Sequence, residues 1–331
     1  GIQFSRGPYT VADALGDYLT GRENRGSKGV SSDRASANAR ILPPLGKIEV
    51  AKLTSEHIRK WHTDLGKAPK LVRGANGEPS RSGKPVDLTD GDAVRARRAT
   101  ANRVLTILKA ALNHAFHEGH TTSDTAWRKV KPFREVDAPV IRFLLPDEAL
   151  RIINAADSDF RNLVRGALLT GCRYGELTRM RASDFNSKGK SIAVRTSKGS
   201  KPRHVHLNDE GTSFFEALTA TAAPHELIFK RRDDTVWGAS QQTRPLKDTC
   251  ARAKIDPAVT FHIFRHTYAS ALAMEGVPMA VIAAQLGHSG TRMTERHYAH
   301  LAPNYIANTV RAAMPHSGFL EPGNITRFKK A

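Results

Sequence analysis

Cysteine, long apolar runs and acidic residues are all scarce in this sequence. The 331 residues include two cysteines, Cys172 and Cys250, which is not the pattern of a disulfide-stapled secreted domain and favours a reducing compartment. No stretch approaches the roughly 18 consecutive apolar residues of a transmembrane helix, and no basic segment followed by an apolar run opens the chain. We therefore expect a soluble, cytoplasmic protein with no membrane partner.

The shortage of acidic residues gives the chain a large positive charge. Lys and Arg number 51 against 32 Asp and Glu, for a formal net charge of +19. A polyanionic partner is the first expectation from this imbalance, and nucleic acid fits best. Charge alone does not distinguish such a protein from a merely soluble basic one, so motifs must decide. The length and the 40% hydrophobic content predict two domains with real cores.

The first part of the chain, residues 1–134, is predicted to be a helical domain. Thr10 with Asp13 forms a capping pair before an apolar helical pattern, and Thr54 precedes a second one. Residues 66–92 are rich in Gly, Pro, Ser and Lys without apolar periodicity, which predicts a long mobile loop. A third helix is expected from about residue 94 to 119.

The start of this third helix carries a cluster of arginines. Its members are Arg95, Arg97, Arg98 and Arg103. Any one of them read alone is best explained as a solvated surface residue. The cluster, in so basic a chain, predicts contacts to DNA phosphates.

After a predicted linker at 135–143, residues 144–316 form a second domain. Pro146 suits the first turn of a helix, and short strands are expected at 191–195 and 203–207 around a basic, Gly-containing turn. Lys201 and Arg203 of this hairpin are predicted DNA contacts. From residue 261 onward the pattern is helical again, and 317–331 is a polar, basic tail. The fold class predicted is therefore mainly α with a small antiparallel β-sheet.

Several fragments of the second domain combine into a specific pattern. They are Thr170-Gly-Cys-Arg-Tyr-Gly-Glu-Leu177, a hairpin lysine, His262-Ile-Phe-Arg-His266, Leu286-Gly-His-Ser289 and Tyr298-Ala-His-Leu301. Their order and spacing resemble the catalytic domain of tyrosine recombinases, the phage integrase family. The helical first part resembles the core-binding domain of that family less specifically. The resemblance implies a helical core DNA-binding domain joined to a mixed α/β catalytic domain.

The chemistry of the motif residues agrees with this resemblance. Attack on a phosphodiester builds negative charge on the non-bridging oxygens, and the planar guanidinium groups of Arg173 and Arg265 can bind these oxygens bidentately. His262 lies three residues before Arg265, so both project from one helical face. We expect His262 to take the phenolic proton from the nucleophile or to hydrogen-bond the phosphate, and His288 to supply a second donor.

A metal site is the competing interpretation of the histidines. His262 and His266 stand at i and i+4, but the Glu of an H-E-x-x-H motif is absent and no third ligand is evident. We therefore predict no metal and no cofactor. His266 is interpreted as a packing residue or as an indirect support of the site.

The resemblance assigns Tyr298 as the nucleophile and Lys198 as the acid that protonates the leaving 5′ oxygen. Lys201, three residues later on the same turn, stays open as an alternative to Lys198. Tyr174, Tyr268 and Tyr305 are the other tyrosines considered, and each is interpreted as structural because of its position relative to the motif. The ten-residue interval from the Leu-Gly-His histidine to Tyr298 is one longer than in some family members.

The resemblance implies a site-specific recombinase that cleaves and rejoins double-stranded DNA at attachment sites through a 3′-phosphotyrosyl intermediate. It also implies a homotetramer on DNA, accessory directionality and DNA-bending proteins, and association with the nucleoid. Integration, excision and dimer resolution stay open, although the stretch around Tyr298 is most similar to prophage and genomic-island integrases. A type IB topoisomerase and a catalytically silent DNA-binding protein are the alternatives. Because residue 1 is Gly and not Met, the question of whether an upstream arm-binding domain precedes it stays open.

Overall fold

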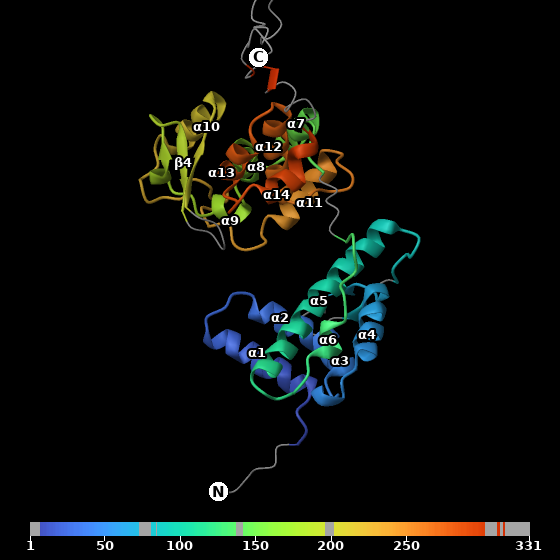
Figure 1. Cartoon of the computed structure of the whole chain (residues 1–331). Coiled ribbons are helices and arrows are strands. Elements are labelled where there is room, and N and C mark those ends of the chain that lie inside the picture. Colours follow the sequence, from blue (N-terminus) through green and yellow to red (C-terminus); the bar gives the residue numbers. More distant parts are fainter. Residues whose placement is uncertain are drawn as a thin grey trace, which may run out of the picture. The chain divides into compact units, whose positions relative to one another are not determined.

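The computed structural model describes residues 7–72, 81–83, 85–136, 142–195, 202–301, 310–311 and 314. The chain divides into two compact units, Gly1–Ala138 and Pro139–Ala331, which Figure 1 colours from blue to green and from green to red. This division falls within the predicted linker at 135–143. The described residues are mostly helical with small antiparallel sheets, so the predicted fold class is confirmed.

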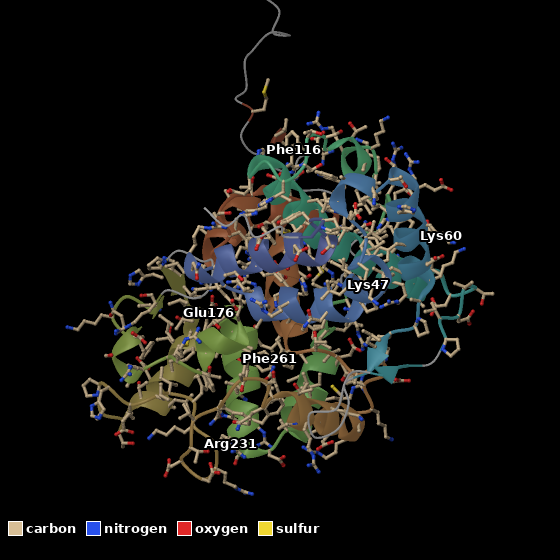
Figure 2. The ribbon with its side chains drawn as sticks, turned by 90° about the horizontal axis from the view of Figure 1, so that it is seen from below. Lys47, Lys60, Phe116, Glu176, Arg231 and Phe261 are labelled. Atoms are coloured by element: carbon tan, nitrogen blue, oxygen red, sulfur yellow. The ribbon has the colours of Figure 1, made fainter. Side chains whose placement is uncertain are left out.

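The first unit is built around its longest helix, which packs against three shorter ones. Its helices are α1 (Val11–Asn24), α2 (Val30–Arg40), α3 (Leu42–Leu45), η1 (Val50–Lys52), α4 (Ser55–Lys67), α5 (Gly91–His117) and α6 (Thr125–Arg128). Helix α5 contacts α1, α2 and α4. Leu108 and Leu112 of α5 are fully buried there, together with Ile58 of α4. Figure 2 locates exposed Lys60 on α4 and part-buried Phe116 near the end of α5.

The predicted helix starts are present. The Thr10 side chain accepts from the backbone N–H of Asp13, whose carboxylate accepts from the Thr10 N–H, so the capping pair is confirmed. Thr54 caps α4 in the same way, with His57 as its reciprocal partner. Helix α5 begins three residues before its predicted start because Asp90 caps it through the N–H groups of residues 92 and 93.

The segment predicted as a loop at 66–92 contains more structure than expected. Helix α4 continues to Lys67, and β1 (Leu71–Val72) pairs antiparallel with β2 (Arg81–Ser82). Strands of two residues are too short to produce a visible period in the sequence. Residues 73–80 and 84 of this segment lie outside the described part of the chain.

The prediction that Arg97 contacts DNA phosphates is corrected by the structure. Its side chain is buried, with 7% of the residue exposed, and its Nε donates to the carbonyl oxygen of Ala68 at 2.7 Å. This bond ties α5 to the residue that follows α4. The structure therefore places Arg97 in the packing of the first unit and not on a surface that DNA phosphates could reach.

The other three arginines are more accessible. Arg95 forms an ion pair with Asp92 at 2.8 Å, and the guanidinium of Arg98 lies 5.3 Å from the centroid of the Phe133 ring. Arg103 is exposed and donates to a threonine one turn earlier. These three side chains stay candidates for phosphate contacts.

The second unit combines helices with a three-stranded sheet. Its elements are α7 (Pro146–Ala155), α8 (Ser158–Thr170), α9 (Tyr174–Leu177), η3 (Ala182–Asp184), β3 (Phe185–Asn186), β4 (Ser191–Val194), β5 (Arg203–His206), α10 (Asp209–Thr219), α11 (Thr243–Arg252), α12 (His262–Met274), α13 (Met279–Leu286), α14 (Arg292–Tyr298) and η4 (Ala299–Leu301). The sheet order is β3-β4-β5, all antiparallel, with Ile192 opposite Val205. The two predicted strands are confirmed, and they pair with each other.

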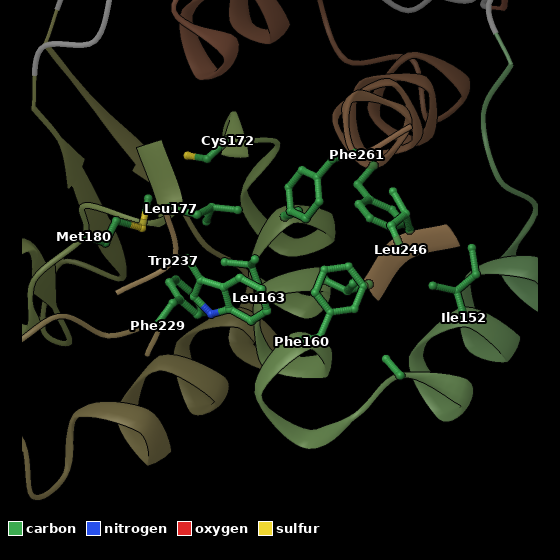
Figure 3. Close-up of a cluster of buried hydrophobic side chains, with 14 of the residues drawn as sticks. Ile152, Phe160, Leu163, Cys172, Leu177, Met180, Phe229, Trp237, Leu246 and Phe261 are labelled. Carbon is green, nitrogen blue, oxygen red and sulfur yellow. The ribbon is translucent and has the colours of Figure 1, made fainter. Parts of the chain in front are cut away.

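A core rich in aromatic side chains holds α8 against the segments around it. Phe160 of α8, Trp237 and Phe261 gather there (Figure 3), with the Phe160 and Trp237 rings 5.8 Å apart. Cys172 and Cys250 are buried and free, so both act as small apolar residues. This core fixes the end of α8, which the turn bearing Arg173 follows, and the start of α12, which carries His262, Arg265 and His266.

Within the described ranges, none of the helices has the length and apolar character needed to cross a membrane.

Candidate active site

The first site arginine stands on a turn that requires glycine. Helix α8 ends at Gly171, whose φ of +63° is in the left-handed region. A Cβ there would lie 2.4 Å from the ring of Tyr268, so both backbone conformation and space favour glycine. Arg173 follows as the N-cap residue of α9, and its backbone N–H donates to Glu176 Oε2 at 2.9 Å.

Glu176 connects two arginines from different elements. Its Oε1 accepts from Arg173 Nη1 at 2.9 Å, and its Oε2 accepts from Arg203 Nη2 at 2.9 Å (Glu176 is labelled in Figure 2). The Glu176 side chain is 1% exposed and that of Arg203 is 7% exposed, whereas the Arg173 side chain is 37% exposed. Glu176 therefore orients an arginine that solvent and ligands can reach by anchoring it to the interior.

Arg203 was predicted as a DNA contact, and the structure corrects this. Besides the ion pair with Glu176, its Nε donates to the carbonyl oxygen of Gln285 on α13 at 2.7 Å. The guanidinium is used inside the protein, where it joins β5 to α9 and α13. The alternation of the strand pattern did not reveal this, because both partners lie far away in sequence.

Arg265 is the most buried of the site cations that the structure describes. It is 2% exposed, and its guanidinium donates to the carbonyl oxygens of Gly171 at 2.9 Å and Leu286 at 2.6 Å. Burial, followed by the nearby charge of Arg173, lowers the pKa of Arg265 to about 10, so it stays protonated at neutral pH. Two guanidinium groups thus lie close together, as an anionic ligand requires.

His288 follows α13 and contacts the same guanidinium. Arg265 Nη2 lies 3.0 Å from His288 Nε2, and His288 Nδ1 lies 2.8 Å from the hydroxyl of Thr294. Because arginine can only donate, Nε2 must accept, and the ring proton lies on Nδ1. Burial, then the charge of Arg265, lowers the pKa of His288 to about 4, which agrees with a neutral ring. In this state His288 accepts a hydrogen bond from Arg265 and helps to hold its guanidinium in place.

Tyr298, the predicted nucleophile, is the last residue of α14. It is 2% exposed and packs against α12 and α13, in a cluster with Ala269 and Leu286. Its hydroxyl lies 2.6 Å from Nδ1 of His266. Burial raises the pKa of Tyr298 to about 12, and the charge of Arg265 acts in the opposite direction. The phenol is therefore protonated in the free protein.

His262 and His266 lie one turn apart on α12. Their rings meet edge to face, with centroids 4.7 Å apart. Partial burial, followed by the charges of Arg265 and Arg173, lowers the pKa of His262. The sequence predicted that His262 takes the phenolic proton or hydrogen-bonds the phosphate, and that His266 packs or supports the site indirectly. The structure brings His266 to the hydroxyl. The i, i+4 spacing of the two histidines was visible in the sequence, but it was considered only as a possible metal site.

The remaining candidates divide between packing positions and the part of the chain that is not described. Lys198 and Lys201 lie outside the described residues, as does Tyr305. Tyr174 donates to the carbonyl oxygen of Gly238 at 2.8 Å, and the ring of Tyr268 packs on Gly171. These two tyrosines have packing roles. In the regions that the structure describes, no three His, Cys, Asp or Glu side chains are grouped as ligands for a metal ion.

Comparison with known proteins identifies the family. Residues 142–304, which contain every described member of this site, match the family model described as "Phage integrase family". The chain therefore contains, in its second unit, a domain of this family of tyrosine recombinases. It is 29% identical over 228 residues to the integrase of Salmonella phage P22, covering 64% of this chain and 57% of the relative, so it spans less than two thirds of that protein.

Solved structures show the same fold. The integrase of transposon Tn1549, in complex with a circular intermediate DNA, matches with a TM-score of 0.69 at 16% identity, over 92% of this chain and 100% of the other. A lambda integrase tetramer bound to a Holliday junction matches with a TM-score of 0.63 at 17% identity, over 86% of this chain and 79% of the other. At these identities the likeness concerns the fold alone.

Proposed function

We propose that this protein is a site-specific DNA recombinase that cleaves and rejoins DNA strands through a 3′-phosphotyrosyl intermediate. The observation that carries the proposal is the convergence of Arg173, Arg265, His288 and Tyr298 from four segments of one unit. Arg265 contacts the turn that presents Arg173 and also contacts His288, and it lies close enough to Tyr298 to act on the pKa of its phenol. A buried tyrosine hydroxyl whose pKa is affected by the charge of Arg265, in a site that also holds Arg173, suits nucleophilic attack on a phosphodiester.

In the cleavage step, the Tyr298 oxygen attacks the scissile phosphorus. Arg173 and Arg265 bind the non-bridging oxygens and stabilise the charge that develops on them. Glu176 keeps Arg173 directed at the phosphate, and His288 does the same for Arg265. The anchors of both arginines exist before DNA arrives, so little reorganisation is needed during the reaction.

The leaving 5′ oxygen must receive a proton, and Lys198, which lies between β4 and β5 in the sequence, is the proposed donor, with Lys201 as the alternative. A phosphotyrosine bond then replaces the bond to the 5′ oxygen. Attack by a 5′ hydroxyl of the partner strand reverses the chemistry and joins the strands, since the phosphotyrosyl linkage retains the phosphodiester energy.

The partner in this account is double-stranded DNA carrying attachment sites, bound by four copies of the protein. The charge of +19 and the exposed arginines Arg98 and Arg103 support DNA binding through phosphates. The lambda integrase tetramer on a Holliday junction supports the proposed assembly. Integration and excision of a mobile element, accessory directionality and DNA-bending proteins, and action on the nucleoid in the cytoplasm belong to the same proposal.

A nicked suicide duplex containing the protein's site tests the proposal, because loss of the short cleaved fragment traps the intermediate. Wild-type protein should give an SDS-resistant protein–DNA adduct, and Tyr298→Phe should give none while still binding the duplex. A catalytically silent DNA-binding protein would shift the duplex without forming an adduct. A type IB topoisomerase would form the adduct and relax supercoiled plasmid without a second DNA site.

A further inference from the structure

The hydroxyl of Tyr298 is directed at His266 and not at the histidine of the His-x-x-Arg motif. The distance from the hydroxyl to His266 Nδ1 is 2.6 Å, short for a hydrogen bond to a neutral ring. His266 is part-buried and Tyr298 is 2% exposed, so bulk water has little access to this proton. Building on the proposed function, we propose that His266 is a catalytic residue that accepts the phenolic proton of Tyr298 when the nucleophile attacks.

The bond changes of this step balance without any further reactant. The bond between the Tyr298 oxygen and phosphorus forms as the bond from phosphorus to the 5′ oxygen breaks. The phenolic proton moves to Nδ1 of His266, which becomes an imidazolium, and the 5′ oxygen takes a proton from Lys198. In the joining step both protons return, since the 5′ hydroxyl gives up its proton and the tyrosine regains its own.

In the free protein this transfer is unfavourable. Burial is the largest cause that lowers the pKa of His266, to about 4, while the pKa of Tyr298 is raised to about 12. The hydroxyl thus donates to a neutral ring whose own proton lies on Nε2, and the phenolic proton stays on the tyrosine. A tyrosine held in this way does not become a phenolate in the absence of DNA.

Substrate binding changes the charge around this pair. The groups that face His266 and lower its pKa are cationic or can become so. They come from α12, from the residue just after α13 and from α14, and they are His262, Arg265, His288 and His297. A scissile phosphate bound to Arg265 neutralises part of this positive field, which favours an imidazolium at His266. Binding of the phosphate that is attacked therefore enables His266 to accept the proton.

The test compares His266→Asn with wild type on the suicide duplex. The amide oxygen of Asn can accept the hydrogen bond at the position of Nδ1 but cannot take the proton at neutral pH. We expect DNA binding and thermal melting close to wild type, with cleavage slower by roughly 100-fold to 10,000-fold. The rate of the variant should rise about tenfold per pH unit, because hydroxide must then remove the phenolic proton. The matched control, His225→Asn, changes an exposed loop histidine and should cleave like wild type.

A second substrate separates this role from protonation of the leaving group. A duplex with sulfur in place of the bridging 5′ oxygen loses its leaving group without a proton, so it should rescue Lys198→Ala but not His266→Asn. Cleavage by His266→Asn within threefold of wild type, or rescue of this variant by the sulfur substrate, would overturn the proposal. If wild type forms no adduct, the proposed function fails and the inference falls with it. An adduct from wild type together with an unimpaired His266→Asn defeats the inference alone.

A measurement on the free protein checks the starting state. In a ¹⁵N histidine NMR spectrum at pH 7, Nδ1 of His266 should be the unprotonated nitrogen and Nε2 the protonated one. A spectrum with the proton on Nδ1 would make the tyrosine oxygen the acceptor and would contradict the proposal.

Discussion

Replacing Glu176 with Gln removes the charge that holds Arg203 and Arg173. The Glu176 and Arg203 side chains are 1% and 7% exposed, so this pair is a buried ion pair and its disruption leaves a guanidinium uncompensated in the interior. Breaking such a pair costs about 3–5 kcal/mol of unfolding free energy. Because Gln keeps the shape and one acceptor oxygen, we expect the lower end, about 3 kcal/mol. Loss of the ion pair with Arg173 adds little to this cost, since the Arg173 side chain is 37% exposed and water replaces the carboxylate.

Urea unfolding of the two proteins, followed by circular dichroism, measures this difference. A loss of about 3 kcal/mol corresponds to a melting temperature lower by roughly 6–12 °C for a unit of this size. The matched control is Glu226→Gln, which removes a carboxylate with a 38% exposed side chain from an i,i+4 pair with Lys230 and should leave the midpoint nearly unchanged. A Glu176→Gln midpoint equal to that of the control would refute the anchoring role assigned to Glu176.

Three further outcomes follow from the structure. Gly171→Ala should lower the melting temperature and slow cleavage, because the backbone there has φ of +63° and the new Cβ would meet the ring of Tyr268; normal melting and cleavage would contradict this. Arg103→Ala should weaken DNA binding uniformly across sequences. It should also reduce by about 1 the slope of log binding constant against log salt concentration, as measured by fluorescence anisotropy, and an unchanged slope would remove Arg103 from the interface. Stability should fall as the pH drops from about 6.5 to about 4, since unfolded His266 and His288 bind protons in this window and the folded rings, with pKa values of about 4, do not; urea unfolding of His288→Gln should show a shallower fall.

The catalytic pattern was visible in the sequence because its members stand in short segments with fixed chemistry. The spacing of His262 and Arg265 predicted one helical face, and both lie on α12. The sequence predicted helix from residue 261 onward, and the short helix α14 ends at Tyr298, ten residues after His288. Apolar periodicity and capping signals such as Thr10 with Asp13 predicted most helices, because these signals act within one or two turns.

The functions of the buried polar groups were not visible, because their partners are distant in sequence. Arg203 bonds to Gln285, 82 positions later, and Tyr298 bonds to His266, 32 positions earlier. Arg97 reaches Ala68 across the predicted loop. A basic residue on a strand or helix end is most simply interpreted as a surface charge, and tertiary packing reversed that interpretation at both arginines.

In the proposed mechanism Tyr298 forms the covalent bond to DNA, and mass spectrometry of the trapped adduct tests this role most directly. Trypsin cleavage after Arg296 and Arg311 gives a peptide of residues 297–311 that contains both Tyr298 and Tyr305, so fragmentation must locate the nucleotide within it. The account predicts the remnant of the 3′ phosphate on Tyr298, whose hydroxyl lies beside His266 and whose phenol is affected by Arg265. A remnant on Tyr305, or on any residue other than Tyr298, would contradict it.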